Sequence, residues 1–307
     1  MPALLRGHDC NMNHLDQLLR FSFDELDIRG EIVYLDESWA QVLARHDYPP
    51  NVRKQLGEAL AVVALLRATI KFDGTLILQV QGKGPLRSLV AQITSQGALR
   101  GLARWEGLIP AGPVSEVFGA GSLIITVMKD SGERYQSIVE LAGTTLSEAL
   151  DRYFEQSEQL PTSFRLHVSP QRVAGFLLQA LPVSSNGSRS EDDRAEDWNR
   201  INILADTLQA DELLQEQPLR LLHKLFHEEQ VHLFDPVPLH FSCTCSRDKV
   251  EKTLITFGAQ DLEDIIVQEG SIKVDCEFCN QHYSFDRSDV ARLFRPDATP
   301  PDGTILH

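Results

Sequence analysis

Four of the five cysteines lie within 37 residues near the C-terminal end of this 307-residue chain. They form a Cys-x-Cys pair, Cys243 and Cys245, followed after thirty intervening residues by a Cys-x-x-Cys pair, Cys276 and Cys279. Four thiolates in two close pairs are a donor set for tetrahedral Zn²⁺, with bonds of about 2.3 Å. The pattern therefore predicts a zinc site that fixes the fold of a small C-terminal module.

The local sequence around the cysteines predicts small elements with few apolar side chains. Ser246 is placed to begin a helix that ends before Gly258, and Asp261–Gln268 has the pattern of a second short helix. Strand-like alternation lies on either side of the Cys276–Cys279 pair. Such a unit is too small to be stable on apolar burial alone, so a metal is expected to hold it together.

Two interpretations of the zinc site follow from the cysteine spacing. The spacing fits a purely structural zinc module, but the single residue between Cys243 and Cys245 departs from the common structural patterns. Zinc keeps its sulfurs as thiolates, the form that peroxide or hypochlorite attacks, and disulfide formation would remove the ligands. Because structural zinc supplies about 10 to 16 kcal/mol of folding free energy and a whole domain is stable by about 5 to 15, metal loss should unfold the module. Spacing does not decide whether neighbouring sulfurs pair or whether they pair across the two pairs.

The first part of the chain alternates strand-like and helix-like stretches. Asn51 is placed to cap a helix running to about Ile70, and β-rich segments follow it. Two further β-rich segments, Ser122–Met128 and Arg134–Leu141, flank an Asp-Ser-Gly turn that is typical of a hairpin. We therefore expect an α+β fold: an N-terminal domain over residues 1–182, built on a largely antiparallel sheet with helices.

An acidic helical linker is expected over residues 183–236. It begins with a Ser-rich and acid-rich stretch, and between Pro182 and Asp235 it has 12 acidic and 5 basic residues. Its apolar residues fall on one face of each of two predicted helices: Trp198, Ile201, Ala205 and Leu208 on the first, and Leu219, Leu222, Leu225 and Phe226 on the second. The pair is too small to have its own core, so these faces are expected to cover another domain. The zinc-binding domain is expected over residues 237–307.

Charge and composition exclude several kinds of partner. With 29 basic and 44 acidic residues, the net charge of −15 opposes binding to nucleic acid or to an anionic membrane. The first twenty residues have no uninterrupted apolar segment, and no later stretch is long and apolar enough for a membrane span. We expect a soluble cytoplasmic protein, in which clustered cysteines indicate metal or redox chemistry. Cys10 stands alone, and no role is predicted for it.

Seven segments spread over nearly the whole chain carry a family resemblance. They are HDYPPNV (His46–Val52), KFDGTLILQVQGKGPL (Lys71–Leu86), LRGLARWEG (Leu99–Gly107), YFEQSEQLPT (Tyr153–Thr162), GFLLQALP (Gly175–Pro182), CTCS (Cys243–Ser246) and CEFCNQHYSF (Cys276–Phe285). In these segments the chain resembles the 33 kDa chaperonin family of redox-regulated heat shock holdases. All four clustered cysteines match the family pattern.

The resemblance implies a molecular chaperone that holds unfolding or oxidatively damaged proteins without ATP during oxidative stress. In that family the reduced protein binds one zinc ion and is inactive. Oxidation there joins the near neighbours, which correspond here to Cys243 with Cys245 and Cys276 with Cys279, and releases the metal. Homodimerisation of the active form is also implied. No enzymatic activity and no catalytic residue are expected.

Two alternatives from other functional classes fit the residues less well. A thiol-disulfide oxidoreductase using Cys276 and Cys279 would need a low-pKa thiol at a helix start, whereas Cys276 follows a strand-like segment. A zinc-ribbon module that binds ribosomes or nucleic acid would need a basic face, yet residues 240–295 have 10 acids and 7 bases. A redox-controlled chaperone fits the sequence better than either alternative.

Overall fold

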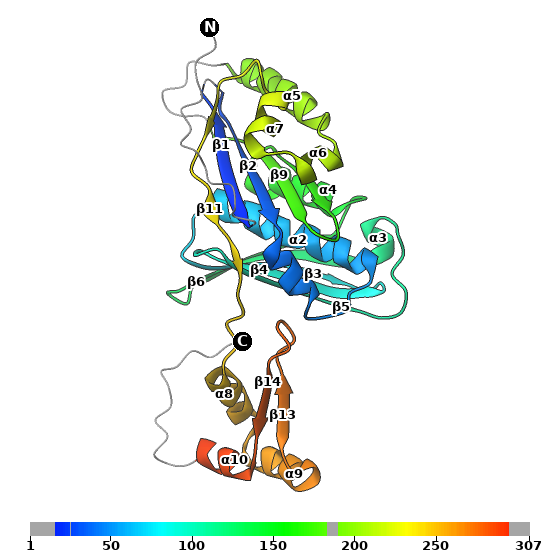
Figure 1. Cartoon of the computed structure of the whole chain (residues 1–307), viewed down its shortest axis with the longest axis vertical. Coiled ribbons are helices and arrows are strands. Elements are labelled where there is room, and N and C mark those ends of the chain that lie inside the picture. Colours follow the sequence, from blue (N-terminus) through cyan, green and yellow to red (C-terminus); the bar gives the residue numbers. More distant parts are fainter. Residues whose placement is uncertain (1–15, 25, 183–189, 295–307) are drawn as a thin grey trace. The chain divides into compact units, whose positions relative to one another are not determined.

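The computed structural model describes residues 16–24, 26–182 and 190–294. The chain divides into two compact units, residues 1–241 and 242–307, and each is described by itself (Figure 1). Cys10 and the Ser-rich start of the predicted linker, residues 183–189, lie outside the described residues. The predicted three-part division at 182 and 236 therefore stays a prediction.

The first unit contains two six-stranded sheets. The first sheet has the strand order β10-β1-β2-β9-β8 with β11 beside β1, and all its pairs are antiparallel. Its strands are β1 (Gln17–Phe23), β2 (Ile28–Leu35), β8 (Thr162–Val168), β9 (Val173–Ala180), β10 (Val231–Leu233) and β11 (Val237–Pro238). The pairing of β2 with β9 joins segments about 140 residues apart, as in Leu35 opposite Val173.

The second sheet has the order β12-β5-β4-β3-β6-β7. Its strands are β3 (Gly74–Gly82), β4 (Leu86–Thr94), β5 (Ala98–Trp105), β6 (Gly121–Lys129), β7 (Arg134–Glu140) and β12 (His240–Phe241). The predicted hairpin is confirmed as the antiparallel pair β6 and β7. Among the strands of the described residues, the short β12 alone pairs in parallel, with β5. The largely antiparallel α+β fold predicted from the sequence is confirmed.

Helix α2 (Pro50–Thr69) contacts strands of both sheets and carries much of the core. Nearly every residue from Val52 to Leu66 is buried, including the polar Gln55 and Glu58, so the helix is enclosed by the fold over most of its length. The predicted helix is confirmed, but its N-cap is Pro49, because the Asn51 amide instead donates to the Ile109 carbonyl at 2.8 Å. The other helical elements between β2 and β8 are short: α1 (Glu37–Leu43), α3 (Val114–Val117), α4 (Leu146–Tyr153) and the π-helical turn η1 (Phe154–Glu158).

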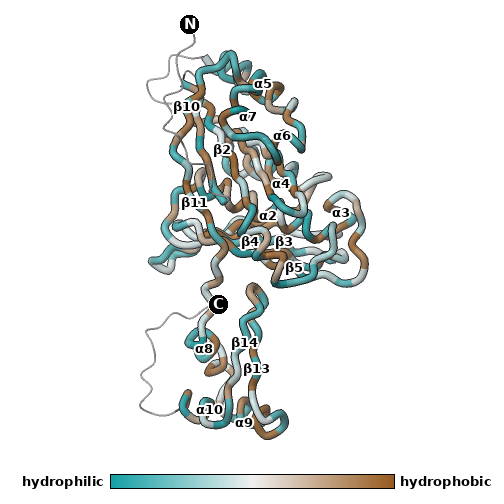
Figure 2. The backbone as a smooth tube through the Cα atoms, viewed as in Figure 1, coloured by the Kyte–Doolittle hydropathy of each residue, from teal (hydrophilic) through white to brown (hydrophobic). Residues whose placement is uncertain are grey.

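Three helices of the predicted linker region pack on the first sheet. They are α5 (Glu191–Asp206), α6 (Ala210–Gln215) and α7 (Pro218–Leu225). Their buried side chains share one apolar cluster with β1, β2 and β9, and Figure 2 shows the alternation of apolar and polar residues along them. We call this the helix–sheet cluster; it contains Leu19, Phe21, Phe23, Ile28, Ile32, Tyr34, Ala174, Phe176, Leu178, Ile201, Ala205, Leu208, Leu213, Leu221, Leu222, Leu225 and Phe226. The apolar faces of these helices thus cover the first sheet, as predicted, and both belong to the same compact unit.

Two details of the predicted helix pair were wrong. A third helix, α6, lies between the two, and Leu219 is exposed whereas Leu221 is buried. The reason is the position of Pro218, which is buried at the first turn of α7. Helical spacing then places Leu221, Leu222 and Leu225 on the same face as Pro218 and turns Leu219 outward.

The second unit is a small mixed fold with one hairpin. It consists of α8 (Arg247–Phe257), α9 (Ala259–Glu269), β13 (Ile272–Asp275), β14 (His282–Phe285) and α10 (Arg287–Leu293). Both predicted helices and both strand-like segments are confirmed. Its core has six buried side chains, Leu254, Leu262, Ile266, Ile272, Phe285 and Val290. Among the described residues of the whole chain, no helix is both long and apolar enough to cross a membrane.

Candidate metal centre

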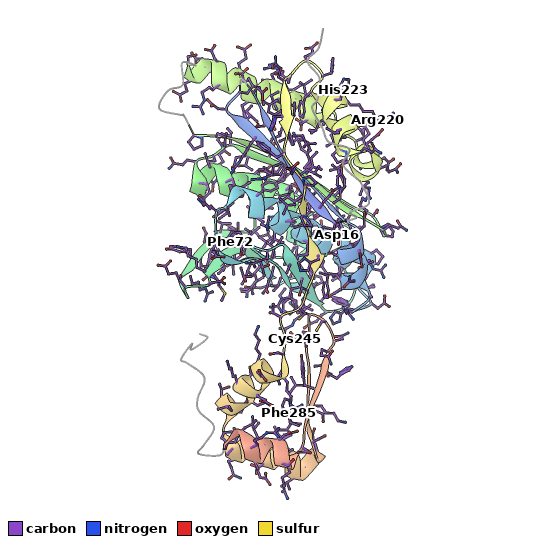
Figure 3. The ribbon with its side chains drawn as sticks, turned by 60° about the vertical axis from the view of Figure 1, so that its left-hand side comes forward. Asp16, Phe72, Arg220, His223, Cys245 and Phe285 are labelled. Atoms are coloured by element: carbon purple, nitrogen blue, oxygen red, sulfur yellow. The ribbon has the colours of Figure 1, made fainter. Side chains whose placement is uncertain are left out.

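The four clustered cysteines come together in the second unit. Cys243 and Cys245 lie in the extended segment before α8, and Cys276 and Cys279 lie in the turn between β13 and β14; Figure 3 labels Cys245. All four sulfurs are within 4.8 Å of one another. The Sγ atoms of Cys243 and Cys276 are 3.7 Å apart, and those of Cys245 and Cys279 are 3.3 Å apart.

The turn between β13 and β14 fixes the second pair of sulfurs. The backbone N–H of Cys276 donates to the Gln281 carbonyl at 3.0 Å, and those of Cys279 and Asn280 donate back to the Cys276 carbonyl at 3.2 and 2.7 Å. Asn280 has φ of +55°, a left-handed conformation that Asn adopts more readily than most residues. This tight turn keeps both sulfurs on one side of the hairpin.

Arg247 holds the first cysteine pair against the hairpin. Its guanidinium donates to the Ser284 carbonyl at 3.0 Å, forms an ion pair with Asp289 at 2.8 Å and lies 4.2 Å from the centre of the Phe285 ring. It also lies directly after Ser246, whose hydroxyl caps α8 by accepting from the Lys249 N–H. These contacts tie the start of α8 to β14 and α10, so the two cysteine pairs keep a fixed relation.

The sulfur positions fit a tetrahedral metal ion. Four sulfurs at about 2.3 Å from a central Zn²⁺ would lie about 3.8 Å from one another. The observed separations, 3.3 and 3.7 Å with an upper limit of 4.8 Å, are close to this value. None of the four cysteines is in a disulfide, for which the sulfurs would be about 2.0 Å apart. The four cysteines are therefore positioned to hold a metal ion.

The protonation of the thiols depends on whether a cation is present. Burial raises the pKa of Cys276, and burial together with the neighbouring sulfurs raises the pKa of Cys279 to about 12. Backbone N–H groups of Cys279 and Phe278 act in the opposite sense on Cys276, and that of Gln281 on Cys279. Cys276 and Cys279 thus hold their protons more tightly without a metal, whereas a bound divalent cation makes coordinating thiols thiolates.

A tyrosine completes the surroundings of the sulfurs. The Tyr283 hydroxyl donates to the Cys245 Sγ at 3.2 Å. Neither this contact nor the role of Arg247 was foreseen in the sequence. Tyr283 was predicted only as a strand residue alternating with Phe285, and nothing in the local sequence relates it to a cysteine 38 positions earlier. The four predicted site residues, in contrast, are all brought together.

Comparison with known proteins identifies relatives over nearly the full length. The family model described as Hsp33 protein matches residues 16–286. A protein named 33 kDa chaperonin from Nitrosococcus oceani is 49% identical over 296 residues, covering 96% of this chain and 100% of that protein. One from Pseudomonas aeruginosa with the same name is 46% identical over 286 residues, covering 92% of this chain and 96% of that protein. The crystal structure of the 33 kDa chaperonin of Thermotoga maritima superposes with a TM-score of 0.77 at 25% identity, covering 90% of this chain and 97% of that one.

Proposed function

The chain belongs to the Hsp33 chaperone family, and from this premise we propose that it is a redox-regulated holdase that works without ATP. The observation that carries the proposal is the gathering of four cysteine sulfurs within 4.8 Å in a unit whose described residues include six buried core side chains. A site of this kind makes the fold of a small unit depend on the oxidation state of its thiols.

We propose zinc as the metal and Cys243, Cys245, Cys276 and Cys279 as its ligands in the reduced, inactive state. A set of four soft sulfur donors in tetrahedral arrangement is typical of zinc. When bound, the ion keeps the sulfurs as thiolates, which are the reactive form toward peroxide. All four cysteines are partly exposed, so a small oxidant can reach them.

Within each pair of cysteines, one molecule of peroxide would oxidise two thiolates to one disulfide. One thiolate attacks hydrogen peroxide, so that an S–O bond forms, the O–O bond breaks, and a sulfenic acid and hydroxide result. The second thiolate then attacks the sulfenic sulfur, an S–S bond forms and a second hydroxide leaves. Two electrons pass from the sulfurs to peroxide. By family resemblance we assign the bonds to Cys243 with Cys245 and to Cys276 with Cys279, which leaves the metal without thiolate ligands.

Loss of the metal is expected to unfold the second unit. Its six-residue core is small, and structural zinc contributes about 10 to 16 kcal/mol in sites of this kind. The segment between α7 and Cys243 belongs almost entirely to the first unit. It is paired with β1 and β5 only through β10, β11 and β12, each of two or three residues. Strands this short fray readily when the chain beyond them loses its structure.

The surface that fraying would uncover is the helix–sheet cluster. Phe226 ends α7 just before β10, is buried, and packs edge-on against Phe23 with ring centres 5.1 Å apart. Loosening of α5, α6 and α7 would expose the apolar side chains of β1, β2 and β9. An exposed apolar sheet is suited to holding unfolded polypeptides, which present apolar segments of their own.

We propose unfolding and oxidatively damaged proteins as the clients. By family resemblance, the active form is a homodimer. The cytoplasm is the proposed location, because a reducing compartment keeps such thiols available for the metal. The named relatives are chaperonins, and no enzymatic activity is indicated.

The test compares reduced and oxidised protein in one aggregation assay. Zinc-loaded reduced protein and peroxide-treated protein are added to heat-unfolding citrate synthase, and light scattering is followed. We expect suppression only by the oxidised form, with reversal by a dithiol and Zn²⁺. Cys10→Ser should behave like the wild type in both states. Equal suppression by both forms, or none by the oxidised form, would contradict the proposal.

A further inference from the structure

The Tyr283 hydroxyl joins the two halves of the metal centre. Tyr283 lies on β14 opposite Val274 of β13, and its ring packs against the core of the second unit. The packing holds the hydroxyl 3.2 Å from the Cys245 Sγ, which comes from the segment before α8. The cysteine thus receives a hydrogen bond from the hairpin that carries the other cysteine pair.

A hydrogen bond of this kind lowers the reactivity of a thiolate. It draws charge away from the sulfur and lowers its basicity, and thiolate nucleophilicity follows basicity with a slope of about 0.4 to 0.5. At the other pair, backbone N–H groups of Phe278 and Cys279 donate to the Cys276 sulfur, and that of Gln281 donates to the Cys279 sulfur. At Cys245 the Tyr283 hydroxyl donates the corresponding hydrogen bond.

We propose that the Tyr283 hydroxyl shields Cys245 from oxidants and thereby sets the peroxide concentration at which the metal centre responds. The inference rests on the redox function proposed above. The step it governs is the attack of the Cys245 thiolate on peroxide, in which an S–O bond forms as the O–O bond breaks and hydroxide leaves. Tyr283 is a positioning and tuning residue that is not itself consumed.

Replacing Tyr283 by phenylalanine tests the proposal with the least disturbance. The ring and its packing remain, and only the hydroxyl is removed. Loss of this 3.2 Å hydrogen bond leaves more negative charge on the Cys245 sulfur. Y283F should therefore oxidise at Cys245 roughly three- to tenfold faster than the wild type. Ser284→Ala, at the next and exposed position on β14, is the matched control and should leave the rate unchanged.

Two rates are measured in zinc-loaded full-length protein over a series of peroxide concentrations. Alkylation of the remaining thiols followed by fragment mass spectrometry gives the oxidation rate of Cys245, and a colorimetric chelator gives the rate of zinc release. The proposal is overturned if Y283F and the wild type oxidise at the same rate. It is also overturned if Y283F releases zinc as fast without peroxide as with it, because Tyr283 would then only stabilise the fold.

A spectroscopic measurement checks the hydrogen bond independently of oxidation. In cadmium-substituted protein, the cadmium NMR resonance should move on Y283F substitution and stay in place for Ser284→Ala. An unchanged cadmium resonance in Y283F would overturn the proposal. These measurements report on thiol chemistry and not on client binding. If oxidised wild-type protein released zinc but failed to hold clients, the proposed chaperone function would be refuted and this inference would stand.

Discussion

Truncation of one isoleucine in α5 should loosen the helices that cover the first sheet. Ile201 is fully buried in the helix–sheet cluster, whereas Ile203, two positions later on the same helix, is 57% exposed. Ile201→Ala and Ile203→Ala therefore remove the same atoms from the same helix. Only the first change opens a cavity beneath the cover.

The magnitude follows from burial. A buried Ile→Ala change costs about 2 to 5 kcal/mol of unfolding free energy, because it loses transfer free energy and leaves a cavity. Alanine also favours a helix over isoleucine by a few tenths of a kcal/mol, and this gain is common to both variants. Ile203→Ala should thus be neutral within about 0.5 kcal/mol. The loss at Ile201 is large beside a total domain stability of about 5 to 15 kcal/mol.

Amide hydrogen exchange of the reduced protein shows which helices lose stability. In Ile201→Ala we expect faster exchange across α5, α6 and α7, with α2 still protected, and more binding of a hydrophobic dye. If the cover controls access to the client surface, this variant should also suppress client aggregation partly without oxidation. Equal exchange in the two variants, or a loss of protection in α2 as large as that in α5, would refute the reasoning that these helices form a separable cover.

Three further predictions concern other parts of the chain. Cys279→Ser should abolish tight zinc binding and unfold residues 242–294, while β2 and α2 stay protected from amide exchange. Metal analysis measures the zinc, and hydrogen exchange measures the unfolding. One equivalent of tightly held zinc in the variant would contradict this prediction. Phe285→Ala, at a fully buried position of the second unit, should cost about 3 to 5 kcal/mol and speed zinc loss to a chelator, whereas Phe257→Ala, 59% exposed, should not; equal rates would be evidence against the six-residue core. Burial raises the pKa of Glu31 to about 7 in the folded chain, so its protonation stabilises the fold, and this stabilisation is complete below pH 4.5 and lost as pH rises through 7. Glu31→Gln should therefore raise stability above pH 7 and flatten the pH dependence of urea unfolding between these values; an unchanged pH profile would show that Glu31 does not titrate in that range.

The elements predicted correctly are those whose signals are local. The long apolar run of α2, the Asp-Ser-Gly turn between β6 and β7, and Ser246 before α8 each fix structure through neighbours in sequence. The four cysteines belong to the same class, because their spacing alone defines a donor set. For this reason the candidate site can be predicted from the sequence alone.

The pairing of strands that are distant in the sequence cannot be predicted from such local patterns. Nothing in β2 or β9 specifies that they pair across about 140 residues, and nothing in His240 and Phe241 indicates a parallel partner in β5. The three short strands β10, β11 and β12 have too few residues to show a period. They place residues 231–241 in the first unit, a connection that arises only when the sheets assemble.

In the proposed switch, metal release and the gain of chaperone activity are one event. The most direct test follows both in a single peroxide time course, with a colorimetric chelator for zinc and light scattering of citrate synthase for client holding. We predict that anti-aggregation activity rises with the same half-time as zinc release, and that a thiol reductant with Zn²⁺ reverses both. Zinc that leaves without any gain in activity, or activity that appears while zinc stays bound, would contradict the proposed switch.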